Sequence, residues 1–171
     1  MRTRLHAVRN ILKAVLLLGG FVAALAALGW WIGGFRLGSI FFVVGLLIAA
    51  TIHWYGPRII LASLGARELT VTEAKLLYTT AERLALDARV GRPKLYLLPG
   101  GHPRALSVGR GAGDFGIAIS QGLATLTTPA ELQGILAHEI AHARQRDVSI
   151  QTPAVLLALW LVEASRIGGF L

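Results

Sequence analysis

Two long apolar runs occupy most of the first third of the chain. The run from Ala14 to Phe35 and the run from Leu37 to Pro57 both lack Lys, Arg, Asp and Glu. A helix of about 20 residues crosses a hydrocarbon core of about 30 Å, so each run is long enough to span a membrane. Aromatic residues of the kind found at membrane interfaces stand near an end of each run: Trp30, Trp31, Trp54 and Tyr55. The pattern predicts a transmembrane helical hairpin within residues 1–56.

A cleaved signal peptide is the alternative interpretation, because basic residues precede the first run. That run is too long for the apolar core of a signal peptide, and no clear small-x-small cleavage site follows it. A second apolar run follows at once. We therefore expect the first run to be a membrane span.

Residues 57–151 have the composition of a small globular domain. A helical pattern begins at Thr72 and ends near Val90, with Pro93 just beyond. Short apolar segments predict strands at 94–98, 105–108 and 115–119. The turns between them are short, which favours an antiparallel sheet. The predicted fold class is α+β.

A second helix is predicted to begin at Thr128. Thr128 suits the N-cap position, Pro129 suits the first helical position and Glu131 completes a capping box. Farther on, the apolar run from Val155 to Leu171 predicts a third transmembrane helix within residues 152–171. It contains Glu163 and Arg166, which are spaced to pair on one helix face. Charged groups in a span face protein or a wet cavity, so we expect other membrane subunits or a homo-oligomer to cover this span.

The composition supports a membrane location. The chain of 171 residues is 54% hydrophobic and 15% charged, against an average near 25% for soluble domains. Only Arg36 lies between the two runs, whereas six basic residues lie just outside them: Arg2, Arg4, Arg9, Lys13, Arg58 and Arg67. This distribution predicts a multi-pass protein of the bacterial inner membrane with its main domain in the cytoplasm. The same distribution explains the net charge of +8 by membrane topology and contacts with lipid headgroups, so we do not expect a nucleic-acid partner. The absence of cysteine excludes disulfides and thiolate ligands.

The predicted second helix carries the sequence HEIAH at residues 138–142. His138 and His142 are four residues apart, so a helix presents them on one face, where each can direct one nitrogen at a single zinc ion. Glu139 lies beside the first histidine and can act as general base towards a water that the metal acidifies. Apolar neighbours such as Leu136 and Ile140 predict a mostly buried helix. Burying these polar side chains there would cost free energy unless they bind a partner such as a metal ion. The pattern predicts a zinc site.

With these motifs, the chain resembles the HtpX-type membrane zinc metalloproteases, which are relatives of the CAAX prenyl protease. The resemblance runs from the N-terminal hairpin to the third apolar run and is most specific at HEIAHARQRD, residues 138–147. It implies a zincin-like cytoplasmic domain with zinc ligands at His138 and His142, a catalytic base at Glu139, and protein or peptide substrates. Where the family has an Asn-Ala-Phe-Ala-like edge strand at the substrate cleft, this chain has Arg104-Ala105-Leu106-Ser107.

The third zinc ligand is the second departure from the family. The resemblance implies a glutamate on a later helix, beyond a second membrane hairpin, whereas this chain stops at Leu171. Glu163 follows His142 by 21 residues, about 30 Å along a continuous helix. His102 and Asp114 lie on predicted loops, where such residues are usually solvated. Two hypotheses remain: a zinc metalloprotease of the HtpX type, or a catalytically inactive, protease-derived subunit of a larger membrane complex.

Overall fold

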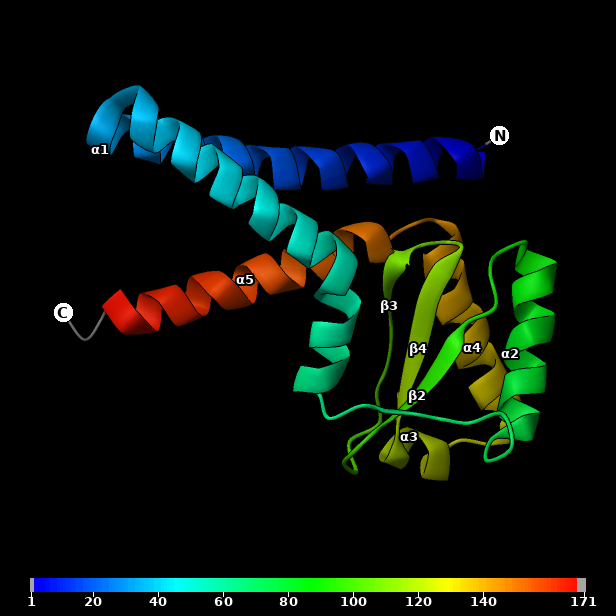
Figure 1. Ribbon diagram of the computed structural model, residues 1–171. Coiled ribbons are helices and arrows are strands. Elements are labelled where there is room, and N and C mark those ends of the chain that lie inside the picture. The colour runs from blue at the N-terminus through cyan, green and yellow to red at the C-terminus, as the bar shows by residue number, and fades with distance from the viewer. Residues whose placement is uncertain (1, 169–171) are drawn as a thin grey trace.

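The long N-terminal helix α1 (Arg2–Ser63) reverses direction at Gly33 and Gly34. The computed structural model describes the backbone of residues 2–168 and the side chains of residues 8–158. Both glycines leave the helical conformation, and Gly34 has a φ of +66°, which side-chain-bearing residues rarely adopt. The two arms of α1 meet at this kink and diverge towards the domain (Figure 1). The reversal fits the predicted hairpin of helices, with its turn just before Arg36.

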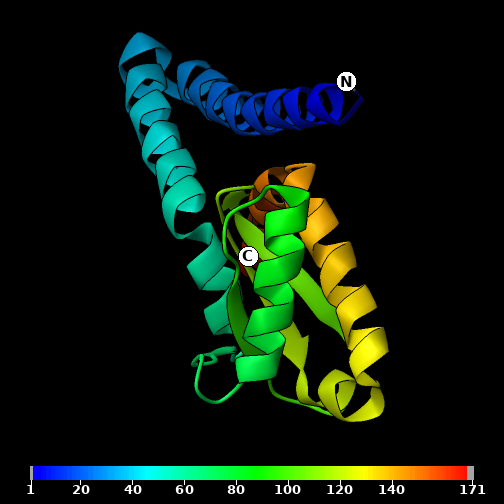
Figure 2. The same cartoon turned by 90° about the vertical axis from the view of Figure 1, so that its right-hand side faces the viewer.

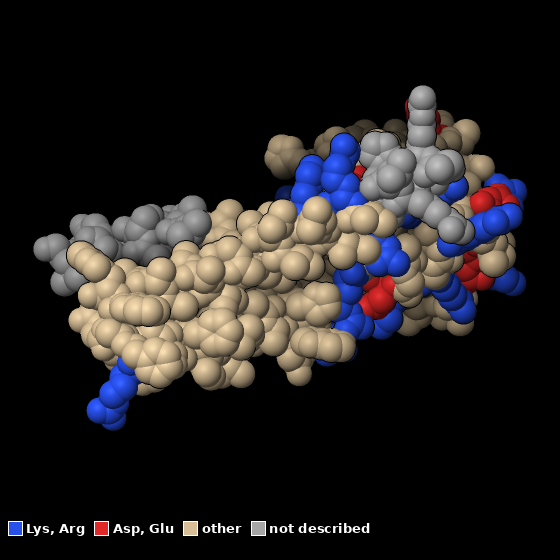
Figure 3. All heavy atoms as spheres, turned by 90° about the horizontal axis from the view of Figure 1, so that it is seen from above, with Lys and Arg blue, Asp and Glu red and all other residues tan. Residues whose placement is uncertain are grey.

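Apolar side chains cover most of the surface of the two arms. Among the residues that the structure describes, Val8–Ser63 is the one helix long and apolar enough to cross a membrane. Figure 3 shows a broad uncharged surface over the arms, while blue and red side chains gather at the opposite end of the molecule. Phe35 beside the kink is 79% exposed. Exposed apolar surface on this scale marks a contact with lipid or protein, which fits membrane association.

The sheet contains four strands in the order β1-β2-β4-β3. They are β1 (Arg67–Glu68), β2 (Lys94–Leu98), β3 (Ala105–Gly111) and β4 (Asp114–Ser120). β1 pairs antiparallel with β2, β2 pairs parallel with β4, and β3 pairs antiparallel with β4. The sheet is therefore mixed, and the prediction of an antiparallel sheet was wrong. The error arose because β4 inserts between β2 and β3, so these two strands are consecutive in sequence but are not neighbours in the sheet.

Ser120 explains how β4 is held between its neighbours. Its side chain is fully buried, and its hydroxyl accepts hydrogen bonds from the backbone N–H groups of Arg104 and Leu123. The backbone N–H of Ser120 donates to the carbonyl of Arg104. One residue thus ties the loop before β3 to the end of β4 and caps the short helix α3 (Gln121–Leu126). Neither β1 nor α3 was predicted from the sequence.

The sheet has a hydrophobic core on each face. On one face it packs against α2 (Lys75–Ala88) and α4 (Pro129–Arg144), and Leu95, Ile117 and Leu136 meet there fully buried. On the other face it packs against the end of α1 and the start of α5 (Val148–Gly168). Figure 2 shows α2 and α4 side by side over the sheet, away from the second arm of α1. The sheet is thus held between α2 and α4 on one face and the ends of α1 and α5 on the other.

The predicted start of α4 is confirmed. The Thr128 hydroxyl accepts from the backbone N–H of Glu131, and the Glu131 carboxylate accepts from the backbone N–H and hydroxyl of Thr128. These hydrogen bonds to the charged form lower the pKa of Glu131. Pro129 occupies the first turn. The capping box therefore fixes where α4 begins and, with it, the rotational position of every residue farther along.

Helix α5 packs against the second arm of α1. A Cβ atom on Gly56 would lie 2.8 Å from Leu156 and 3.0 Å from Thr152, so the glycine permits this close approach. The described apolar part of α5, Val148–Ala158, is shorter than a membrane span. Glu163 and Arg166, predicted to pair within a third span, lie outside the described side chains.

Candidate metal centre

The HEIAH motif lies in the C-terminal half of α4, as predicted. Leu136, Ile140 and Ala143 point into the core between α4 and the sheet, with at most 2% of each residue exposed. Because they hold that face inward, His138 and His142 lie on the outer side: His138 is exposed and His142 is half-buried. The expectation of a mostly buried helix was wrong for this face. The helix is buried along one stripe only, and the histidines point out of it.

The two histidines face one another with the nitrogens that a metal would need. His138 Nε2 lies 3.2 Å from His142 Nε2, and the ring planes are perpendicular with centres 4.7 Å apart. Two nitrogens that each lie about 2.05 Å from a tetrahedral zinc ion are about 3.3 Å apart. The observed separation also suits a hydrogen bond between one protonated and one unprotonated nitrogen. The pair therefore fits two ligand positions of one zinc ion.

The other nitrogen of His142 is held by Asp147. Asp147 Oδ2 lies 2.9 Å from His142 Nδ1, and the backbone N–H of Asp147 donates to the carbonyl of His142. The chain turns back at Arg146, which has a φ of +60° and brings Asp147 beneath the last turn of α4. A carboxylate on Nδ1 fixes the ring orientation and leaves Nε2 free to bind a metal. Asp147 was not predicted to belong to the site.

Glu139 is the buried member of the motif, with 8% of the residue exposed. Among the described side chains, none makes a hydrogen bond or ion pair with its carboxylate, and neither oxygen is fully enclosed. A carboxylate with no cation and no hydrogen-bond donor beside it keeps both oxygens available to accept a proton. This arrangement is the one that a general base requires.

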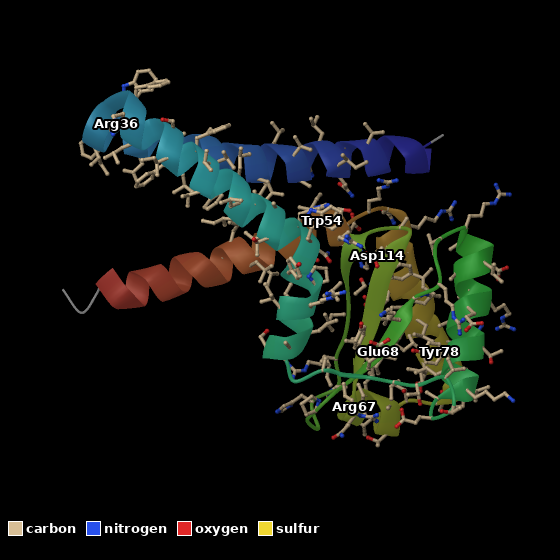
Figure 4. The ribbon with its side chains drawn as sticks, viewed as in Figure 1. Arg36, Trp54, Arg67, Glu68, Tyr78 and Asp114 are labelled. Carbon is tan, nitrogen blue, oxygen red and sulfur yellow. The ribbon has the colours of Figure 1, made fainter. Side chains whose placement is uncertain are left out.

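A third ligand for the pair is not present among the described residues, which contain no group of three His, Cys, Asp or Glu residues arranged to hold a metal ion. Neither His102 nor Asp114 approaches the pair closely enough to complete one. Asp114 forms an ion pair with Arg110, whose guanidinium lies 4.8 Å from the centre of the Trp54 ring. Figure 4 shows Asp114 and Trp54 where the hairpin meets the sheet. Among the described residues, the geometry of His138 and His142 thus suits two of the four positions around a tetrahedral zinc ion, with the Asp147 carboxylate beside His142.

A residue of the hairpin also reaches this centre. Asn10 Nδ2 donates to the carbonyl of Gln145 at 3.0 Å and to Asp147 Oδ1. Asn10 was not predicted to belong to the site either. The available signal was a lone amide side chain between Arg9 and the apolar residues that follow it.

Comparisons with known proteins agree with the motif. A sequence profile described as "Peptidase family M48" matches residues 72–168. The "Protease HtpX homolog" of Syntrophobacter fumaroxidans is 37% identical over 141 residues, which are 80% of this chain and 50% of that protein. The proteins of the same name from Aquifex aeolicus and Pyrococcus abyssi are 37% and 35% identical over 74% and 86% of this chain. These matches cover 43% and 51% of those two proteins. The chain spans about half the length of the curated relatives it matches.

Proposed function

The chain belongs to peptidase family M48, and from this membership we propose that it acts as a membrane-associated zinc metalloprotease of the HtpX type. The observation that carries the proposal is the 3.2 Å separation of His138 Nε2 and His142 Nε2, which suits two ligands of one zinc ion. The matches to relatives named as proteases support it as well. The hypothesis of a catalytically inactive structural subunit has no comparable support.

In this proposal the chain's own residues bind the ion and move the proton. His138 and His142 would hold the zinc ion through Nε2, and Asp147 holds the His142 ring in the orientation that this requires. A bound zinc ion would lower the pKa of a water molecule and polarise the scissile carbonyl. Glu139 accepts the proton of the attacking water and returns it to the departing amide nitrogen. The products are a free carboxylate and a free amine.

The third ligand comes from outside the described residues. A catalytic zinc site has three protein ligands and one open position, and the described residues supply two. The family resemblance assigns the third to a glutamate on a later helix. This assignment explains why the two histidines already have the separation of zinc ligands although the described residues contain no third ligand.

The edge strand β3 is the proposed docking surface for an extended peptide. β3 is the outermost strand on its side of the sheet, and Ala105 packs against the core that contains Leu136 of α4. The Gly109 end is covered by the Thr152 hydroxyl, which lies 3.3–3.5 Å from the Gly109 backbone oxygen and nitrogen. The segment from Ala105 to Ser107 is left to pair with substrate by β-augmentation. Main-chain pairing needs no particular side chain, so the departure from the family's edge sequence is compatible with it.

The membrane setting is also part of the proposal. We assign both arms of α1 to the membrane, with Arg36 at the outer face and the globular domain in the cytoplasm, because basic residues are concentrated on the domain side. α5 forms the third span. A contact with another subunit or a second copy then covers Glu163 and Arg166.

Zinc content tests the metal site directly. The purified protein should bind about one zinc ion per chain. His138→Ala and His142→Ala should each remove most of that metal, because a single imidazole holds zinc weakly. His102→Ala is the matched control and should retain the metal, because His102 does not join the pair. Zinc is measured by elemental analysis after dialysis against a weak chelator. Equal zinc in the wild type and the two site variants would refute the assignment.

A further inference from the structure

Asn10 is the one buried side chain among residues 8–21 of the first arm of α1. The residue is 7% exposed, whereas every other side chain from Val8 to Phe21 is at least partly exposed. An amide costs free energy to bury unless its hydrogen-bonding groups find partners. The only buried side chain of this stretch is therefore polar, and its hydrogen-bond partners must offset the free-energy cost of burying it.

Both described partners of the Asn10 amide lie just beyond the C-terminal end of α4, the helix that carries His138 and His142. Asn10 Nδ2 donates to the carbonyl oxygen of Gln145, the C-cap residue that follows α4, and to Oδ1 of Asp147. Both partners are hydrogen-bond acceptors, so the amide nitrogen and not the amide oxygen must face them. The other oxygen of Asp147 is the one that lies 2.9 Å from His142 Nδ1. The contacts form a continuous line from Asn10 through Asp147 to His142 and its Nε2 atom.

We propose that Asn10 is a positioning residue through which the first arm of α1 orients Asp147 and, through Asp147, the metal ligand His142. The proposal rests on the proposed function, in which His142 binds zinc. A carboxylate with one oxygen held by Asn10 cannot rotate away from the imidazole that its other oxygen contacts. Loss of such a supporting partner typically lowers metal affinity by about 10- to 100-fold. Because Asn10 acts one contact farther out, its loss should lower the affinity by about 10-fold.

This role differs from simple anchoring of the arm. Leucine has a similar size to asparagine and would keep apolar packing, but it cannot donate to Asp147. Aspartate keeps the shape but would bring a carboxylate against two acceptors. Anchoring by packing predicts that Asn10→Leu binds zinc as the wild type does. Positioning predicts that Asn10→Leu and Asn10→Asp both bind zinc more weakly, with Asn10→Asp the weaker.

The test is a double-mutant cycle on zinc affinity in the detergent-purified protein. Zn²⁺ dissociation constants are measured by competition with a chromophoric chelator for the wild type, Asn10→Leu, Asp147→Ala and the double variant. If Asn10 acts through Asp147, the double variant should bind zinc no more weakly than Asp147→Ala alone. Leu12→Ala, an exposed position on the same arm, is the control and should leave the constant unchanged. An unchanged constant in Asn10→Leu, or effects that multiply in the double variant, would overturn the proposal.

A metal-free measurement separates this proposal from the proposed function. The ¹⁵N NMR shifts of labelled histidine report which ring nitrogen of His142 carries the proton at about pH 8.5, where an ordinary histidine is neutral. The wild type should show the Nδ1–H tautomer, and Asn10→Leu should shift the ring towards a mixture. A shift of this kind in a protein that binds no zinc would refute the metalloprotease and leave the positioning role standing. Identical tautomers in the two proteins would refute the positioning role.

Discussion

Glu139→Gln is expected to abolish peptide-bond hydrolysis while the bound zinc is retained. Glutamine has nearly the shape of glutamate but cannot accept a proton from the attacking water. General base catalysis contributes about 10²- to 10⁴-fold to rates, so kcat/KM should fall by about 10³-fold or more. The KM should change little, because no substrate-binding contact is assigned to this carboxylate.

The assay should be run in native membranes, where whatever supplies the third ligand is present. The readout is cleavage of an unfolded, casein-type substrate, with zinc content measured in parallel. Glu131→Gln is the matched control, since it makes the same chemical change on the same helix and glutamine also serves in a capping box. Hydrolysis that survives in Glu139→Gln would show that another group activates the water. Loss of zinc together with activity would mean that Glu139 supports the metal site and is not its base.

The helix that carries the site was predictable because its signals are local. Thr128, Pro129 and Glu131 determine the start of α4 through contacts within four residues of each other. Once the start is fixed, helical periodicity places His138 and His142 on one face. The degree of burial was not predictable from composition alone. Alanines at 137 and 141 suit the surface as well as the core, and only packing against the sheet shows which stripe is covered.

The sheet order was not predictable from turn lengths. Short turns favour pairing of consecutive strands, but the loop before β3 passes the end of β4, where Ser120 holds it. One signal in the sequence did point to a central position for β4. The segment from Phe115 to Ile119 has no polar alternation, which is typical of a strand covered on both faces, and the structure buries all of it.

The supporting contacts of the site depend on distant parts of the chain. Asp147 reaches His142 only because Arg146 takes a positive φ, and nothing in the local sequence demands that conformation. Asn10 lies 137 residues from Asp147, and no periodicity connects them. Motifs therefore indicate the candidate metal ligands, whereas the residues that contact and orient those ligands are brought in by tertiary structure.

The orientation of the hairpin in the membrane can be tested by cysteine labelling, for which we expect an all-or-none result. The chain has no cysteine, so a single introduced cysteine reports on one position without background. Phe35→Cys lies beside the kink and keeps Arg36, while Leu86→Cys lies on α2 at a site that is 76% exposed. Figure 4 shows Arg36 at the opposite end of the molecule from the domain. If the basic residues outside the hairpin face the cytoplasm, the kink must face the opposite side of the membrane.

A membrane-impermeant maleimide applied to intact spheroplasts should therefore label Phe35→Cys and leave Leu86→Cys unlabelled. After the membrane is permeabilised, Leu86→Cys should react fully, which shows that exposure of the thiol was never limiting. The unsubstituted chain should remain unlabelled in both conditions. Labelling of Leu86→Cys before permeabilisation would place the domain outside the cell and reverse the proposed topology. Protection of Phe35→Cys in intact spheroplasts together with Leu86→Cys would mean that the kink does not cross the membrane, because the arms would then lie along the surface without spanning it.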